Sequence, residues 1–220
     1  MNELVFLLHL LCVSIASLVV LRMGYEALCA FLCVQAILAN LFVIKQISLC
    51  GFNATAADIY VVGSVFTLNL MQEYYGFKHA RKAVWISFCL LIFYTIVSQI
   101  HIWYIPSFAD FSQSHYYQLL SYMPRLATAS IVVYLLVQYF DTYFYALIKN
   151  FFKGKYIIVR NIISITISQF LDTILFSFLG LYGIVENIAH IILISFLVKL
   201  IALLLLSPFV LSLQNWIQKN

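Results

Sequence analysis

Long apolar runs, separated by short polar turns, make up almost the whole chain. Seven runs approach the ~20 residues that a helix needs to cross the hydrocarbon core of a bilayer. They cover residues 4–21, 27–47, 56–75, 83–103, 126–148, 157–181 and 188–216. Apolar and polar residues do not alternate within them, so the pattern predicts helices and not the strands of a membrane barrel. The last run is overlong and contains Pro208, which predicts a kink or an interfacial tail there.

The composition also indicates a membrane protein. Of the 220 residues, 65% are hydrophobic and 9% are charged, whereas a soluble domain carries about 25% charged residues. Backbone groups in lipid must be satisfied internally, which long helices achieve. We therefore predict an all-α integral membrane protein with about seven spans, forming one transmembrane domain over residues 1–220. The first run lacks a basic start and a small-residue cleavage site, so we expect it to be retained.

The positions of Lys and Arg predict the orientation. They gather in alternate turns, after the first, third and fifth runs: Arg22; Lys78, Arg81 and Lys82; and Lys149, Lys153, Lys155 and Arg160. Loops rich in Lys and Arg face the cytoplasm. The sequence thus predicts an external N-terminus and a cytoplasmic C-terminus, which carries Lys219. The net charge of +4 follows from this asymmetry, so we expect no nucleic-acid partner.

The sequence lacks the usual motifs of enzymes and metal sites. Its five cysteines form no C-x-x-C pair and are best explained as small packing residues. We find no zinc pattern, phosphate-binding loop or nucleophile elbow. The chain also has only seven glycines, which leaves little room for a loop that cradles phosphate. We therefore expect no cofactor, no bound metal and no enzymatic activity.

Polar residues inside the apolar runs are the candidate functional groups. An ionisable residue at the centre of a membrane helix costs about 2.5–3.5 kcal/mol, so its presence needs a reason. Two runs contain nearly the same stretch, VQYFDTYFY (Val137–Tyr145) and SQFLDTILF (Ser168–Phe176). The shared Q-x-x-D-T indicates either an inverted repeat with a site near the midplane or a chance match. Ser164, Ser168 and Asp172 are spaced four residues apart and so share one helix face. The candidate binding residues are Asn40, Asn69, Glu73, Arg125, Gln138, Asp141, Gln169, Asp172, Thr173, Phe176 and Lys199.

Structural pairing is the alternative explanation for some of these charges. The candidate pairs are Arg125 or Lys45 with Asp58, Glu73 with Arg81, and Asp172 with Lys199. A buried pair costs desolvation and is weak evidence for stability. For Asp172 and Lys199 we therefore favour a water-lined cavity in which these groups meet a ligand.

Five pieces of the sequence resemble the queuosine precursor transporters, a family of small integral membrane proteins. They are ANLFVIK (39–45), VFTLNLMQEYYGFKHARK (65–82), RLATASIVVYLLVQYFDT (125–142), RNIISITISQFLDTILF (160–176), and Lys199 with Pro208. Their order and spacing are those of the family. The resemblance implies a six-helix family unit over residues 27–216, with 4–21 as an accessory first helix. Asn69 stands where the family usually has Asp, so this position offers hydrogen bonds and no charge.

The resemblance implies a transporter of the cell membrane, the inner membrane in a bacterium. Its substrate would be a 7-deazaguanine base, either queuine or the cyano- or aminomethyl-deazaguanine precursor, for the queuosine of tRNA. A guanine-like edge has two adjacent N–H donors, which Asp172 or Asp141 is suited to accept. The amides suited to the other polar edges are Gln169, Gln138, Asn40 and Asn69. Phe176 offers a ring for stacking.

Other functions stay open from the sequence. The chain is also suited to be the substrate-capture subunit of an ATPase-driven vitamin-type transporter, or a transporter of another nucleobase-like solute. A membrane enzyme would have to use the two Asp-Thr motifs, which have no His beside them. The expected partners are the small-molecule substrate and the lipid bilayer, and a homodimer stays open as the oligomeric state. Because Lys199 supplies a counter-ion to the carboxylates, we expect facilitated transport, with the base trapped in tRNA.

Overall fold

The computed structural model describes residues 1–151 and 157–201. Its helices are α1 (Asn2–Arg22), α2 (Tyr25–Phe42), α3 (Asp58–Tyr75), α4 (Phe77–Ile102), α5 (Gln113–Leu120), α6 (Met123–Phe151) and α7 (Ile157–Phe176), and α7 continues into the π-helix η1 (Ser177–Leu181). One more helix, Ile188–Ile201, is the last described helix. Lys153, Lys155, Pro208 and Lys219 lie outside the described residues.

Helices lie where the apolar runs predict them, with ends shifted by several residues. Five helical segments of the described chain are long and apolar enough to cross a membrane: Asn2–Arg22, Tyr25–Phe42, Phe77–Ile102, Gln113–Asp141 and Ile163–Leu181. α3 is not among them, because Asp58, Asn69 and Glu73 reduce its apolar character, and the last described helix is shorter. The protein is therefore a mostly helical, multi-pass membrane protein. That all seven predicted segments cross the membrane stays a prediction.

A β-hairpin between α2 and α3 corrects the all-α prediction. Strands β1 (Gln46–Leu49) and β2 (Phe52–Thr55) pair antiparallel, with Gln46 opposite Thr55. The turn uses Cys50 and Gly51, which both have positive φ, as the favoured two-residue hairpin turns require. Polar and apolar residues alternate along β1, and this period of two was overlooked at the end of the run 27–47. α2 therefore ends at Phe42, before the hairpin.

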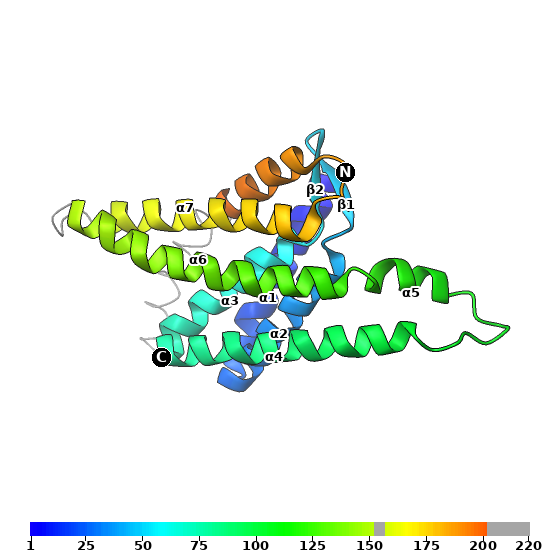
Figure 1. Cartoon of the computed structure of the whole chain (residues 1–220). Coiled ribbons are helices and arrows are strands. Elements are labelled where there is room, and N and C mark those ends of the chain that lie inside the picture. Colours follow the sequence, from blue (N-terminus) through cyan, green and yellow to red (C-terminus); the bar gives the residue numbers. More distant parts are fainter. Residues whose placement is uncertain (152–156, 202–220) are drawn as a thin grey trace.

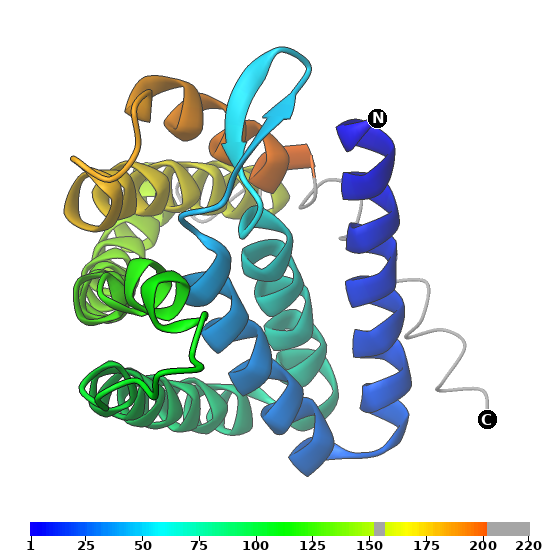
Figure 2. The ribbon, with the colours of Figure 1, turned by 90° about the vertical axis from the view of Figure 1, so that its right-hand side faces the viewer.

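The helices form two sets that cross one another. Figure 2 shows α4, α6 and α7 nearly end-on, whereas α1, α2 and α3 run up and down the picture. α2 contacts both sets, since it packs on α3 and also on α4 and α6. α6 and α7 lie side by side in Figure 1, and the last described helix lies at an angle beside α7. The arrangement differs from a simple bundle of parallel spans.

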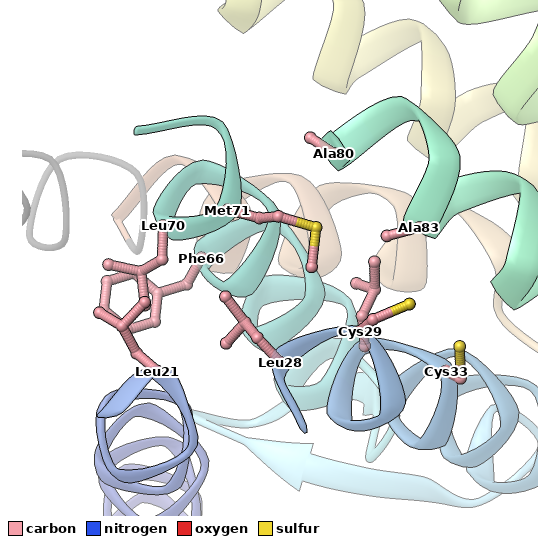
Figure 3. Packing of buried hydrophobic residues seen from close by; sticks show 10 residues of the cluster. Leu21, Leu28, Cys29, Cys33, Phe66, Leu70, Met71, Ala80 and Ala83 are labelled. Carbon is pink, nitrogen blue, oxygen red and sulfur yellow. The ribbon is translucent and has the colours of Figure 1, made fainter. Parts of the chain in front are cut away.

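The apolar core lies where α1, α2, α3 and α4 meet (Figure 3). It contains Leu21, Leu28, Cys29, Leu32, Cys33, Phe66, Leu70, Met71, Ala80 and Ala83. The two buried cysteines are free thiols within this cluster, as expected for packing residues. Small residues on α4 allow its first turns to approach α2 and α3 closely, a common device in membrane helices.

The first helix is closely packed against α3. A Cβ on Gly63 of α3 would lie 2.4 Å from Val13 Cγ1, so glycine is required for this approach. A buried hydrogen bond joins the same helices, since Ser17 Oγ and Thr67 Oγ1 are 3.1 Å apart, and Gln35 Nε2 on α2 donates to the same Thr67 Oγ1 at 3.0 Å. α1 therefore supports α3.

The segment between α4 and α6 projects from the end of the helices (Figure 1). It exposes Trp103, Tyr104, Phe108 and Phe111, the kind of aromatic side chains that gather at membrane–water interfaces. Asp110 accepts hydrogen bonds from the backbone and the hydroxyl of Ser112, and these hold the pKa of the Asp110 carboxyl below its usual range. The two hydrogen bonds between Asp110 and Ser112 stabilise the turn that leads into α5.

Candidate functional site

Asp172 and Lys199 form an ion pair between α7 and the last described helix. Lys199 Nζ donates to Asp172 Oδ2 at 2.6 Å and to Thr173 Oγ1 at 3.1 Å. The Lys199 side chain is buried, with 8% exposed, whereas 28% of the Asp172 side chain is exposed. The carboxylate of the pair is therefore partly accessible, whereas the ammonium group is buried.

Asp58 lies on the other side of Lys199, at the start of α3. Its residue is 4% exposed, and its Oδ2 accepts a hydrogen bond of 2.8 Å from Ser195 Oγ. Asp58 thus contacts the same helix that carries Lys199. Ser195 and Lys199 are four residues apart on one helix, so they present neighbouring polar groups on one face. Lys199 thus lies near two carboxyl groups that come from different helices.

Asp141 has different partners. Its Oδ1 accepts hydrogen bonds from Ser164 Oγ at 2.8 Å and from Ser168 Oγ at 2.6 Å. Both serines are buried on α7 and lie one and two turns before Asp172. The predicted polar face of α7 is therefore confirmed for its described residues. On this face, Ser164 and Ser168 contact α6, whereas Asp172 contacts the last described helix.

These groups form three hydrogen-bonded sets within apolar helices, which together we call the polar path. Its members are Asp141, Ser164, Ser168, Asp172, Thr173, Lys199, Ser195 and Asp58. They come from α3, α6, α7 and the last described helix. Of the predicted binding residues, the structure brings Asp172, Thr173 and Lys199 into direct contact, and Asp141 on α6 binds Ser168, one turn before Asp172 on α7.

Asn40 and Arg125 join helices at other places. Asn40 on α2 is buried, and its Oδ1 accepts a hydrogen bond of 2.8 Å from Ser130 Oγ on α6. The Arg125 guanidinium donates to the carbonyl oxygens of Leu179 and Tyr182, at 2.9 and 2.7 Å. Arg125 therefore satisfies carbonyl groups at the end of η1, which a helix end leaves without partners.

The other predicted residues lie at the edges of the polar path or away from it. Asn69 and Glu73 are exposed on α3, and Gln138 is exposed on α6. Gln169 is partly buried, and its carbonyl oxygen accepts the hydroxyl hydrogen bond of Thr173. Phe176 is partly buried beside Gly180. The structure does not place these five side chains in contact with Asp172 through any described hydrogen bond.

Two of the alternative charge pairs do not form. Among residues 1–151 and 157–201, ion pairs join Lys199 with Asp172 and the N-terminal amine with Glu3. Asp58 therefore pairs with neither Arg125 nor Lys45, and Glu73 does not pair with Arg81. The Asp172–Lys199 pair does form, as one of the structural alternatives predicted.

Sequence reasoning missed Asp58 and Ser195 as members of the site. From the sequence, Asp58 is expected only as a partner of Arg125 or Lys45. Ser195 gave no signal, since a serine in an apolar helix most often bonds to its own backbone. The four-residue spacing of Ser195 and Lys199 was the one feature that could have indicated a shared polar face.

The arrangement is suited to bind a polar solute within the membrane. A partly exposed carboxylate can accept two adjacent N–H donors of one ligand, and charge-assisted hydrogen bonds of this kind are the strong ones. Phe170 lies next to the path, with its ring centroid 4.9 Å from that of Phe196. No cluster of His, Cys, Asp or Glu suited to a metal ion occurs among the described residues.

Comparison with known proteins agrees with a transport site. Residues 55–213 match the family described as "Putative vitamin uptake transporter". A curated relative from Bacillus subtilis (strain 168), named "Probable queuosine precursor transporter", is 31% identical over 186 residues, which cover 83% of this chain and 81% of the relative. No solved structure matches the chain. The family match and the similarity to this relative cover most of the chain, so the chain belongs to this family of membrane transporters. The matched residues include all members of the polar path.

Proposed function

We propose that this protein imports a queuosine precursor into the cytoplasm for tRNA modification. The substrate class is a 7-deazaguanine base: queuine or its cyano- or aminomethyl-deazaguanine precursor. The name of the Bacillus subtilis relative supports this choice. The observation that carries the proposal is the partly exposed Asp172 carboxylate, held by Lys199 inside an apolar helix pair.

The carboxylate would recognise the guanine-like edge of the base. This edge presents two adjacent N–H donors, and the two oxygens of Asp172 can accept both. In the structure, Lys199 donates to Oδ2 of Asp172 and compensates its charge. A buried acceptor left without a partner costs about 1–3 kcal/mol, which would discriminate against bases that lack one donor.

Aromatic side chains near Asp172 would hold the ring of the base. Phe176 lies one turn after Asp172 on α7, and Phe170 lies two residues before it. Stacking on an aromatic face contributes about 1–3 kcal/mol per base and needs no particular base edge. Amides of Gln169 and Gln138 are the candidates for the carbonyl edge, since each lies within a turn of a path carboxylate.

We propose the orientation that the Lys and Arg pattern predicts, with the N-terminus outside. The structure supports it at one end of the molecule. Tyr25 at the start of α2 contacts the rings of Tyr75 and His79, and its hydroxyl donates to the His79 carbonyl oxygen at 3.3 Å. The basic turns beside Arg22 and Lys78 therefore lie together, as expected for one face of the membrane. A reporter after Lys153 should read cytoplasmic and one at Ser112 external; the opposite labelling would contradict the orientation.

Uptake measurements test the proposed function. Cells without their own importer should accumulate labelled queuine or one of the two precursors when they express this chain. The same uptake in vesicles that contain the purified chain alone would show that no ATPase partner is needed. Uptake in cells but not in vesicles would favour the substrate-capture subunit, and no uptake of any of the three bases would contradict the substrate class.

A further inference from the structure

We propose that Lys199 is an exchangeable counter-ion, which leaves Asp172 for Asp58 when the substrate binds Asp172. Asp58 is then a positioning residue for transport, although it does not touch the substrate. The inference rests on the proposed function, because it needs a ligand that competes for the Asp172 carboxylate. It goes beyond that function by giving a role to a buried carboxyl group at the start of α3.

The first argument is the cost of releasing Lys199. Its side chain is 8% exposed, so it has little access to water. Removing the partner of a buried charge is strongly destabilising. A substrate that took both oxygens of Asp172 would have to overcome this cost, unless a second acceptor lay within reach of the ammonium.

Asp58 is in the right place to be that acceptor. It hydrogen-bonds to Ser195, which lies one helical turn, about 6 Å, from Lys199 on the same helix. A lysine carries three donors on a flexible four-carbon stem, so its ammonium can change partners through side-chain rotation. We therefore expect the exchange to proceed by rotation of the Lys199 side chain.

The difference in exposure gives the exchange a direction. Asp172 is the accessible carboxylate, with 28% of its side chain exposed, whereas Asp58 is 4% exposed and hydrogen-bonded to Ser195. A ligand can therefore reach Asp172 and not Asp58. Substrate binding would draw Lys199 towards α3 and weaken its link to α7. This would couple occupancy of the site to the contacts of the last described helix with α7 and with the start of α3.

The affinity of an Asp58 variant tests the inference. Purified Asp58→Asn protein should bind labelled queuine or the preferred precursor about tenfold or more weakly than the wild type, because Lys199 keeps Asp172. Ser17→Ala is the matched control, since it removes a buried hydrogen bond to α3 outside the polar path. Its dissociation constant should equal that of the wild type. If Asp58 only stabilises the start of α3, Asp58→Asn will lower the yield of folded protein with unchanged affinity, which overturns the inference.

A second experiment needs no substrate. In the structure of Asp172→Asn, or of Asp172→Ser if the first variant does not fold, Lys199 Nζ should lie within hydrogen-bond distance of Asp58. An ammonium that stays beside residue 172 and Thr173 would overturn the inference. Failure of the proposed function looks different, since the wild type would then bind none of the three bases while this structural result still held.

Discussion

The two Q-x-x-D-T stretches place their aspartates in different surroundings. Asp141 on α6 is held by the hydroxyl groups of Ser164 and Ser168. Asp172 on α7 is held by the ammonium of Lys199 and lies beside Thr173. Hydroxyl groups satisfy a carboxylate but leave its charge uncompensated, whereas an ammonium does both. The same short sequence has therefore produced a hydrogen-bonded acid and an ion-paired acid.

The difference arises from what each helix packs against. α6 and α7 are antiparallel neighbours, since Arg125 near the start of α6 reaches Leu179 just beyond α7, while Asp141 reaches Ser164. Asp141 thus faces the serine side of α7, and Asp172 faces the last described helix. A repeated motif specifies local chemistry but not its partners. On this basis we assign substrate binding to Asp172 and a supporting role to Asp141.

The largest expected effect is that of Asp172→Asn. The substitution keeps the shape but replaces one acceptor by a donor and removes the charge. Uptake of the labelled base should fall about tenfold or more, because a charge-assisted hydrogen bond contributes about 1.5–3 kcal/mol. Uptake per folded protein is the measurement, with surface expression as the control. Normal uptake would show that the Asp172 carboxylate is not needed for substrate binding.

Asp141→Asn should have a smaller effect. The remaining amide oxygen can still accept from Ser164 and Ser168, so the α6–α7 contact is largely kept. We expect uptake to fall less than about threefold, since neutral hydrogen bonds of this kind differ by about 1 kcal/mol or less. A loss as large as that of Asp172→Asn would show that the two aspartates act together and would contradict their different roles.

Ser164→Ala and Ser168→Ala test the hydroxyl side of the comparison. Each removes one donor to Asp141 and should lower the free energy of unfolding by about 1–2 kcal/mol, because the second serine still satisfies the carboxylate. The double variant should lose more than the sum of the two single losses. Thermal unfolding in detergent measures these differences, and additive losses would mean that the serines do not share one acceptor.

The smallest expected effect is that of a pH gradient. Lys199 compensates Asp172 without a proton, so the substrate carboxylate has no need to carry one. Accumulation in proteoliposomes should therefore be nearly the same with and without an imposed gradient, as facilitated transport requires. Concentrative uptake that collapses with an uncoupler would contradict this and make Asp172, Asp141 or Asp58 the proton site.

The helices were predictable because membrane helices leave a plain signal. Their apolar runs are long, and the basic turns mark their ends. The hairpin Gln46–Thr55 was not predicted, because its alternation of polar and apolar residues extends over only four residues in each strand. A short alternating segment is difficult to distinguish from the end of a helix.

The candidate site was predictable only where both partners were unusual residues. Asp172 and Lys199 are charges in the middle of apolar runs, and so their pairing was foreseen as one alternative. Asp58 and Ser195 are 137 residues apart in the sequence, and neither has a neighbour that indicates the other. Their contact depends on how the last described helix crosses α3, which no periodicity encodes. Arg125, Asn69 and Glu73 were unusual for their positions but do not lie in the polar path.

The central claim is that the Asp172 carboxylate recognises two adjacent donors of the base, and a binding cycle tests it most directly. The measurement is the dissociation constant of purified wild type and Asp172→Asn for the preferred base and for an analogue without the exocyclic amine. The wild type should bind the analogue about tenfold or more weakly, whereas Asp172→Asn should bind both ligands with similar, low affinity. Equal discrimination by the two proteins would show that another group binds this edge of the base and would contradict recognition by Asp172.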